Sequence, residues 1–417
     1  MNQIFKMAIR NLMRYKRRTL LTALLITMGI LMVILFSGLA GSFTKMMIGH
    51  ITDSNLAQMQ IHKKGYISSI DSMPLNLNLS QAEYNTIEKI LQNNPEVEAY
   101  APRIKFSAML SNYAETTNIR LNAVDPEKET MVCPDVENRM VFKDNAREKI
   151  FVKPGEIIIP KNMAKGMKIK VGGPVVIVAQ NRDGSINGLN FIVAAIIDSV
   201  LGPQGKEGYI HINDARTLLR MEKSEVTEIA VRIKKFDKLS PVYAELKSSL
   251  LKFKNKKAGP IFEIHTWEKL SPFVNIAKMI NLMTISMKLI MIIIVLISIL
   301  NIMMMSVYER VSEIGTMIAL GTSPGKIMGL FISEGFFLGL ISAVAGNVIG
   351  IAGLYLLNIF KIRFSFSRMD NLLLSPAINI NELFWLTAIV LLVSVFATLQ
   401  PAYKASKMEP VDALRHV

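Results

Sequence analysis

Four long apolar runs alternate with polar segments along the chain. The runs at 19–43, 289–307 and 383–403 contain no Asp, Glu, Lys or Arg, and the run at 327–360 contains one such residue, Glu334. An α-helix needs about 20 predominantly apolar residues to cross the hydrocarbon core of a bilayer. The pattern therefore predicts four transmembrane helices, at 19–44, 281–308, 326–360 and 382–403.

The first run could instead be a signal peptide, because "SGLAGS" near its end offers small residues for cleavage. Its apolar stretch exceeds the roughly 7–15 residues of a signal h-region, so an uncleaved helix is the better interpretation. The tail at 1–18 contains six basic residues and no acidic one, which predicts a cytoplasmic N-terminus. These basic residues are Lys6, Arg10, Arg14, Lys16, Arg17 and Arg18.

Four crossings return the C-terminal tail, 404–417, to the cytoplasm, where its basic residues agree with the positive-inside rule. The short loop at 361–381 then lies outside, although it contains Lys361, Arg363 and Arg368. The larger basic cluster at the N-terminus outweighs this conflict.

The polar segment at 45–280 shows strand and helix signals. "SQAEYNTIEKILQNN" predicts a helix with a capping box of Ser80 and Glu83, "EGYIHINDARTLLRM" a strand and a helix capped by Asn213, and "TEIAVRIKKFDKLSPVYAELKSSL" a strand and a helix from Ser240-Pro241. Between them, "GEIIIP", "VGGPVVIVAQ" and "NRDGSINGLNFIVAAII" are β-rich. We therefore expect an α/β part at 45–103 and 206–270, interrupted by a β-rich insert at 104–205.

The fold class predicted is an α-helical membrane protein with four transmembrane helices and a large α+β extracytoplasmic domain between the first two. The second helix should begin as a stalk outside the bilayer, because "HTWEKLSPFVNIAKMINLMTISMK" is amphipathic. Lys288 is expected to snorkel to the outer surface.

Composition and motifs limit the classes of function that we expect for the chain. The net charge of +15 in 417 residues is divided between the N-terminal tail, the flanks of the helices and a mixed-charge domain, so membrane anchoring explains it better than nucleic-acid binding. Cys133 is the single cysteine and excludes an intramolecular disulfide. The five histidines are isolated, which predicts no metal site, and the chain contains no HExxH or G-x-S-x-G motif, which predicts a non-catalytic protein.

The segment 309–325 connects the second and third helices. "IALGTSPGKIMG" resembles a phosphate-binding loop, but its glycine spacing and the Ile after Lys326 do not fit one. An apolar stripe with charged residues opposite predicts a short amphipathic helix over Arg310–Leu320 that Gly321 ends. A passive surface connector is the alternative. The stripe is Val311, Ile314, Met317, Ile318 and Leu320, and the polar side is Glu309, Arg310 and Glu313.

The third helix carries a stripe of small residues, which lets another helix approach closely. Packing within the subunit is the favoured interpretation over dimerisation. Glu334 is an intramembrane acid, a functional candidate that pairing with another helix or snorkelling near Lys326 also explains. The glycines of the stripe are Gly335, Gly339, Gly346 and Gly350.

Three segments resemble one family. "YERVSEIGTMIALGTSPGKIMGLFISEG" is similar to the R-x-x-E-I-G…ALG…E-G segment of ABC-transporter permeases of the FtsX-like and MacB-like type. "AIRNLMRYKRRTLLTALLITMGI" resembles their first helix, and "QPAYKASKMEPVDALRHV" resembles their ending. Within the family, the chain resembles the lipoprotein-releasing (LolC/LolE-type) permeases.

The resemblance implies a porter-like α/β part with a β-rich insert, and a permease that pairs with a second copy or a paralogue and with two copies of an ABC ATPase. ATP and Mg would then be bound by the ATPase, and this chain would hold no cofactor. The short helix would be the coupling helix that docks on the ATPase. Its matching residues are Arg310, Glu313, Ile314, Gly315, Leu320 and Gly321, with Met317 on the same apolar stripe.

The resemblance also implies a location in the inner membrane of a bacterium, with both termini cytoplasmic and the large domain periplasmic. Family members move lipoproteins, drugs or peptides, or regulate an extracytoplasmic partner. The chain has no fused ATPase, which favours release of a lipoprotein or another amphipathic cargo from the outer leaflet. Mechanotransmission for export of drugs or peptides, or for regulation, remains the alternative.

Overall fold

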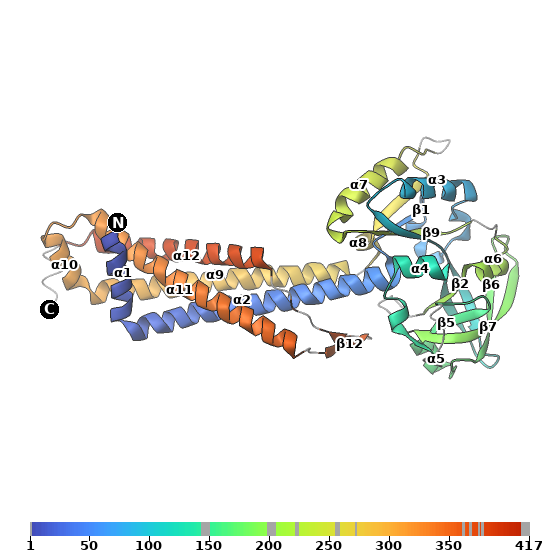
Figure 1. Ribbon diagram of the computed structural model, residues 1–417, viewed down its shortest axis with the longest axis horizontal. Coiled ribbons are helices and arrows are strands. Elements are labelled where there is room, and N and C mark those ends of the chain that lie inside the picture. The colour runs from blue at the N-terminus through green and yellow to red at the C-terminus, as the bar shows by residue number, and fades with distance from the viewer. Residues whose placement is uncertain are drawn as a thin grey trace. The chain divides into compact units, whose positions relative to one another are not determined.

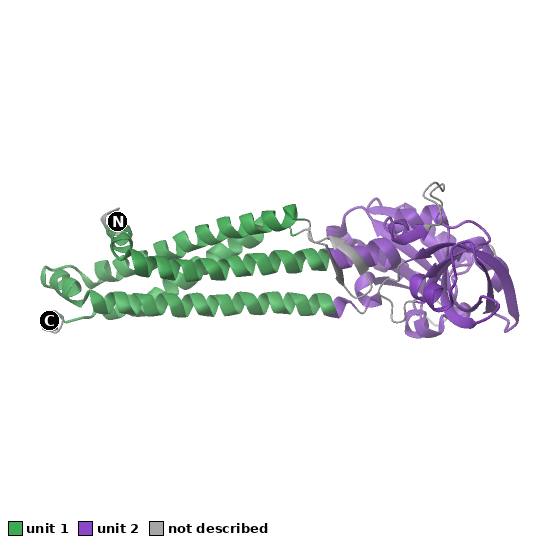
Figure 2. Cartoon of the chain, turned by 90° about the horizontal axis from the view of Figure 1, so that it is seen from below, with its two compact units in different colours: residues 1–45, 276–364, 373–417 green, residues 46–275, 365–372 purple. Residues whose placement is uncertain are grey.

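The chain folds into two compact units, seen in the computed structural model (Figure 2). One unit is helical and comprises Met1–Lys45, Ile276–Phe364 and Leu373–Val417; the other is an α/β domain of Met46–Asn275 with Ser365–Leu372. The structure describes residues 2–142, 151–197, 206–221, 225–254, 259–271, 273–360, 363–366, 369–373, 376 and 379–409. Lys361, Arg368 and the family-like ending beyond residue 409 lie outside the described residues.

The helical unit contains six helices among the described residues (Figure 1). They are α1 (Asn2–Arg14), α2 (Lys16–Ile51), α9 (Val274–Glu309), α10 (Val311–Ala319), α11 (Pro324–Ile359) and α12 (Ile380–Ser406). Of the described helices, α2, α9, α11 and α12 are long and apolar enough to cross a membrane. At 36 residues each, α2, α9 and α11 exceed the roughly 20 that a bilayer requires.

The four long helices share one apolar core. Ile30 of α2, Val295 and Ile299 of α9, Leu338 of α11 and Val390 of α12 are all buried in one cluster. In lipid, contacts of this kind are held by close packing rather than by expulsion of water, so the fit between helices matters more than their apolarity.

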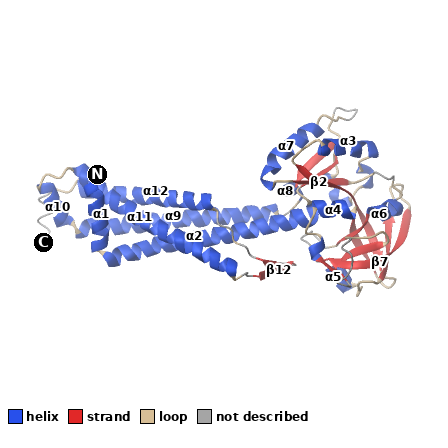
Figure 3. Cartoon of the chain, in the orientation of Figure 1, coloured by secondary structure: helices blue, strands red, loops and turns tan. Residues whose placement is uncertain are grey.

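The α/β domain is built on one twisted sheet (Figure 3). Its described strands run in the order β10-β1-β9-β2-β3-β8-β5-β7-β4, and β6 pairs with β2 and β7. The bounds are β1 (Met59–Lys63), β2 (Val97–Ser111), β3 (Thr116–Val124), β4 (Met140–Phe142), β5 (Glu156–Pro160), β6 (Pro174–Gln180), β7 (Ile186–Ile197), β8 (Glu207–His211), β9 (Glu228–Ile233) and β10 (Phe262–Thr266). A separate pair joins β11 (Arg363–Phe366) and β12 (Met369–Leu373).

The sheet runs across both boundaries drawn from the sequence. The 15 residues of β2 pass residue 104 without a break, pairing with β9 at one end and with β3 and β6 at the other. Likewise β8, placed by sequence with the α/β part, lies between β3 and β5 of the β-rich part. A long strand can serve two regions of a sheet, and composition alone does not reveal this.

Seven helices of the α/β domain accompany the described strands. They are η1, a π-helix (Thr52–Leu56), α3 (Gln81–Gln92), α4 (Pro126–Val132), α5 (Lys161–Gly166), α6 (Ile212–Leu219), α7 (Leu239–Leu250) and α8 (Trp267–Leu270), in addition to short 3-10 turns. The capping box of Ser80 and Glu83 is confirmed at α3. The predicted cap Asn213 is wrong: the imidazole Nδ1 of His211 accepts the Asn213 N–H instead, because α6 begins two residues earlier than that cap requires, at Ile212.

Candidate functional site

The short helix α10 is a separate element between α9 and α11. The backbone leaves the helical region at Arg310, where φ is −114° and ψ is 20°, and α10 starts at Val311. Gly321 follows its end with φ +84°, a conformation that costs glycine little, and Ser323 with Pro324 then starts α11. These residues make two sharp turns, so α10 projects as a tip at one end of the helical unit.

One face of α10 packs on the ends of the long helices. Ile314 is buried in a cluster with Val307 of α9, Phe331 of α11 and Ala402 of α12, and Met317 contacts its edge. Gly315 is buried beside it. Leu320 differs from the predicted stripe: its side chain is 82% exposed, since it follows the last turn of α10 and points away from this cluster.

Arg310 belongs to the predicted polar side, with Glu309 and Glu313. It is only 6% exposed. Because the helix breaks at this residue, its side chain turns toward α11, where Nη1 lies 2.9 Å from Glu334 Oε1. The guanidinium carbon also lies 5.6 Å from the ring centroid of Phe331. Arg310 therefore joins the start of α10 to α11 by an ion pair and a cation–π contact.

Glu334 is 3% exposed and has two partners on different elements. Besides Arg310, the Asn11 amide of α1 donates a hydrogen bond of 2.7 Å to its Oε1. The pairing interpretation of this acid thus agrees with its contacts, although the partner is Arg310 and not the nearby Lys326. A charge in this environment is tolerated when it is paired and hydrogen-bonded.

Glu313 extends the same cluster to the surface. Its carboxylate contacts Arg310 Nε at 3.1 Å and Arg14 Nη1 at 2.9 Å. Arg18 makes a parallel ion pair with Glu309 at the end of α9. The basic N-terminal segment is therefore bound to both sides of the α9–α10 turn.

The sequence analysis missed the roles of Asn11, Arg14 and Arg18. It treated the residues before the first long helix only as a determinant of orientation. A sequence signal was available, because residues 2–14 form a strongly amphipathic helix, the pattern of a helix that packs one face on another element. In the structure Ala8 of this helix is fully buried and Arg10 is exposed. Its Phe5 ring meets Phe337 of α11 edge to face, at 5.8 Å between centroids.

The glycines of α11 face helices of the same chain. A Cβ added at Gly335 or Gly339 would collide with Thr398 or Ser394 of α12. At Gly346 and Gly350 it would lie 2.7 Å from Ile30 and 2.8 Å from Ile34 of α2. The stripe therefore serves two intramolecular interfaces, one toward each end of α11.

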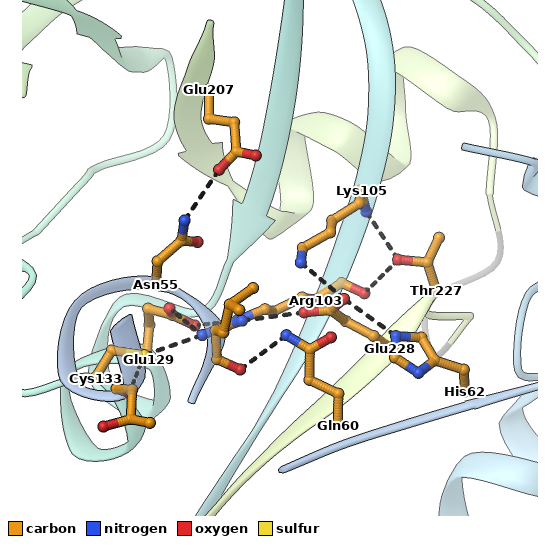
Figure 4. Close-up of polar contacts among 12 residues, drawn as sticks. Asn55, Gln60, His62, Arg103, Lys105, Glu129, Cys133, Glu207, Thr227 and Glu228 are labelled. Atoms are coloured by element: carbon orange, nitrogen blue, oxygen red, sulfur yellow. Dashed lines mark hydrogen bonds and ion pairs between the residues drawn. The ribbon is translucent and has the colours of Figure 1, made fainter. Parts of the chain in front are cut away.

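A second polar cluster lies inside the α/β domain, where the chain enters it from α2 (Figure 4). The entry segment, residues 52–60, comprises η1 and the start of β1. Side-chain contacts hold it to the rest of the domain at several residues. Asp53 pairs with Arg232 at 2.7 Å, Asn55 donates to Glu207 at 3.2 Å, and the Gln58 side chain accepts the Ile233 N–H at 2.9 Å. The domain therefore holds this segment firmly.

Beside the entry segment lies a buried network of charges. Arg103 binds both oxygens of Glu129, at 2.7 and 2.8 Å, and Glu228 at 3.0 Å. Lys105 and His62 contact the other oxygen of Glu228 at 2.9 and 3.3 Å. Burial by itself raises the pKa of Glu228, but Lys105, the His62 hydrogen bond and Arg103 outweigh it and hold this pKa below the usual range.

Cys133 closes the network on the side of the entry segment. Arg103 Nη2 donates to its Sγ at 3.2 Å, and the thiol lies 3.7 Å from the Thr52 carbonyl oxygen. Burial raises the pKa of Cys133 to about 12, against the opposing charge of Arg103. The thiol is thus neutral at physiological pH and is a packing element of the domain.

The chemistry of both clusters is that of ion pairing. Among the described residues no group of three or more His, Cys, Asp or Glu has the arrangement of a metal site. Each cluster instead connects separate elements: the first joins α1, α10 and α11, and the second joins β1, β2, β9 and α4.

Comparisons with known proteins agree with this architecture. The MacB-like periplasmic core domain matches residues 19–249, more than half of the chain, and the FtsX-like permease C-terminal domain matches residues 285–410. The chain is 23% identical over 368 residues to the lipoprotein-releasing system transmembrane protein LolC of Neisseria meningitidis, covering 84% of each chain. It is 24% identical to LolE of the same system in Haemophilus influenzae, covering 79% of this chain and 80% of LolE.

A third relative aligns over nearly the whole length. The ABC transporter permease YknZ of Bacillus subtilis is 24% identical over 424 residues, which cover 99% of this chain and 98% of YknZ. The first family match covers most of α2 and of the α/β domain, and the second covers most of the last three long helices. The chain therefore belongs to the FtsX-like and MacB-like family of ABC-transporter permeases, as a multi-pass membrane protein.

Proposed function

We propose that this permease couples ATP hydrolysis by a separate ATPase subunit to movement of its α/β domain, and that this movement releases lipoproteins from the outer leaflet of the cytoplasmic membrane. In this account α1, α10 and both termini are cytoplasmic and the α/β domain is periplasmic. Two ATPase copies bind ATP and Mg, and two permease chains, identical or paralogous, form the membrane part.

The observation that carries the coupling proposal is the triad of Arg310, Glu313 and Glu334. It fixes α10 to α11 through a buried ion pair and to α1 through a surface one. A force applied to α10 would therefore displace α11 and α1 together. Leu320, exposed at the tip, offers an apolar side chain to a partner.

In the α/β domain, the strands next to α2 and α9 are the ones that would receive this force. Strand β1 follows α2 and strand β10 precedes α9, and these two strands pair antiparallel in the sheet. Relative motion of α2 and α9 would act on adjacent strands. The fastened entry segment would then pass this motion into the domain instead of absorbing it.

The cargo proposal rests on the relatives. LolC and LolE are named as parts of a lipoprotein-releasing system, and each aligns with this chain over about four fifths of its length. Export of a different cargo is the competing hypothesis, and it is kept open by the full-length alignment with YknZ, whose name states no cargo.

A crosslinking experiment tests the docking of α10. Leu320→Cys is made in a Cys133→Ser background, so that the new thiol is the only one, and the protein is purified from its native membrane under mild conditions. We expect a maleimide crosslinker to join position 320 to an ATPase subunit. Tyr355→Cys in α11, 65% exposed on the membrane-spanning part, is the matched control and should give no such product. A failure of Leu320→Cys to crosslink to any ATPase would overturn the coupling proposal.

Mass spectrometry of the same preparation tests the cargo. Triacylated lipoproteins bound to the complex, and lost on addition of ATP and Mg, are the expected result. A complex that contains the ATPase but only another class of bound molecule would retain the coupling proposal and reject lipoprotein release.

A further inference from the structure

A groove opens between α9 and α12 at the end of the helical unit away from α10. It has a volume of about 330 Å³, within the range of small-ligand sites. Its apolar wall includes Met291, Ile292 and Trp385, and its polar mouth is formed by Lys288, Glu382 and the side chains of Asn379 and Asn381. An apolar trough with one polar end matches the shape of an amphipathic molecule.

The depth of the polar mouth matches that of a headgroup. Ala402 of α12 packs against the cluster that holds α10, so it marks one end of the unit. Residues 382 to 402 of one helix span about 30 Å, which is the thickness of the hydrocarbon core. Glu382 therefore lies near the interface opposite to α10.

Lys288 and Glu382 form an ion pair at this mouth, and their side chains remain 34% and 31% exposed. The pair also contacts a third helix, because the Ser37 hydroxyl of α2 donates a hydrogen bond to Glu382. Of the described contacts, both hydrogen bonds that Glu382 accepts fall on Oε1. Oε2 and the remaining ammonium hydrogens of Lys288 can therefore bind a second pair of opposite charges.

We propose that this groove binds a phospholipid whose headgroup carries a phosphate and a primary ammonium. The phosphate accepts hydrogen bonds from Lys288 and from the asparagine amides, while the ammonium donates to Glu382. One acyl chain lies along the apolar wall. A quaternary ammonium has no N–H to donate. An anionic headgroup brings a phosphate but no ammonium for Oε2 of Glu382, so both should bind less well.

Tryptophan fluorescence tests the proposal on the full-length wild-type chain in vesicles. The chain has two tryptophans: Trp385 in this groove and Trp267, which is buried in the α/β domain. Brominated acyl chains quench a tryptophan that they contact. Vesicles of phosphatidylcholine would contain a small, equal fraction of brominated phosphatidylethanolamine, phosphatidylcholine or phosphatidylglycerol.

The expected result is an apparent affinity about fivefold higher for the brominated phosphatidylethanolamine than for the brominated phosphatidylcholine, the ratio that one net hydrogen bond supplies. Glu382→Gln should remove the preference. Glu309→Gln, the same change at the opposite end of α9, should retain it, and Trp385→Phe should remove the quenching.

Three outcomes would overturn the proposal. Equal quenching by phosphatidylethanolamine and phosphatidylcholine would show bulk lipid at Trp385, and a preference for phosphatidylglycerol would show a simple cationic site. Absence of quenching by every brominated lipid would show that protein, such as a second copy of this chain, covers the groove. None of these outcomes bears on docking of an ATPase at α10.

Discussion

At the scale of single residues, buried charges are concentrated where one element must hold another. Arg310 and Glu334 join α10 to α11, and Arg103 with Glu228 joins β2 to β9. A buried ion pair contributes little net stability compared with apolar side chains, but the loss of one partner is costly because the other charge stays buried. Both pairs should therefore be sensitive to single substitutions and tolerant of paired ones.

Arg310→Met should destabilise the helical unit by about 3–5 kcal/mol, because it leaves the Glu334 carboxylate without its cation. The double variant Arg310→Met/Glu334→Leu should recover most of the lost thermal stability, measured by unfolding in detergent micelles. It should not recover transport if the pair also transmits force. A double variant no more stable than Arg310→Met would contradict the pairing.

The network around Glu228 should make the α/β domain sensitive to acid. Because the folded-state pKa of Glu228 is lowered, its ionised form adds stability that is present above the ordinary Glu value of 4.5 and is lost as the pH falls below it. Glu228→Gln should cost about 3–5 kcal/mol at pH 7 and less at pH 3, where part of this contribution has already been lost. Trp267 fluorescence during urea unfolding at both pH values measures this, with the exposed Glu245→Gln in α7 as a control. An equal cost of Glu228→Gln at both pH values would be inconsistent with the network.

Cys133 provides a direct report on opening of the same region. It is the only thiol of the chain, it is fully buried, and its raised pKa keeps it neutral. We expect N-ethylmaleimide to modify it at least about a hundredfold more slowly in the native protein than in urea, since local opening must come first. Rapid modification of the native protein would show that the entry segment is not held as described.

At the scale of elements, α11 is the helix whose packing the sequence predicted most fully. Its glycine stripe follows from composition and helical period alone. The partners did not follow: Gly335 and Gly339 meet α12, whereas Gly346 and Gly350 meet α2. Spacing shows which face a helix buries, but the neighbour depends on how the other helices pack.

For the charged residues too, the sequence indicated which residues matter but not which partners they contact. The acid Glu334 and the end of the short helix at Gly321 could be predicted from local signals in the sequence. The partners Asn11 and Arg14 were not, because they lie about 300 residues away in sequence. In the sheet, the strands of 97–111 and 207–211 were assigned to regions by composition, although pairing across the sheet decides their place.

A matched pair of substitutions tests the packing of α11. Gly346→Ala places a methyl group 2.7 Å from Ile30 and should cost about 1–3 kcal/mol through overpacking. Gly329→Ala in the same helix meets nothing within 4 Å and should leave stability unchanged or slightly higher. Thermal unfolding in detergent separates the two. Equal melting temperatures would show that α2 does not approach α11 at this point.

At the scale of the whole molecule, the long helices α2 and α9 lead along the chain to strands β1 and β10, which pair in the sheet of the α/β domain. Family membership supports a permease, and the triad at α10 supports coupling to a separate ATPase. The substitution Glu313→Lys places a cation beside Arg310 and Arg14. It should uncouple ATP hydrolysis from cargo release without unfolding α10. Glu245→Lys, the same charge change on the exposed face of α7, serves as the control.

The most direct test is the number of ATP molecules hydrolysed for each cargo molecule released, measured in proteoliposomes that contain the permease and its ATPase. For Glu313→Lys the account predicts continued hydrolysis with release reduced at least about tenfold, so that this ratio rises, while Glu245→Lys keeps the wild-type ratio. A wild-type ratio for Glu313→Lys in a complex of normal composition would contradict the claim that α10 transmits the force of ATP hydrolysis.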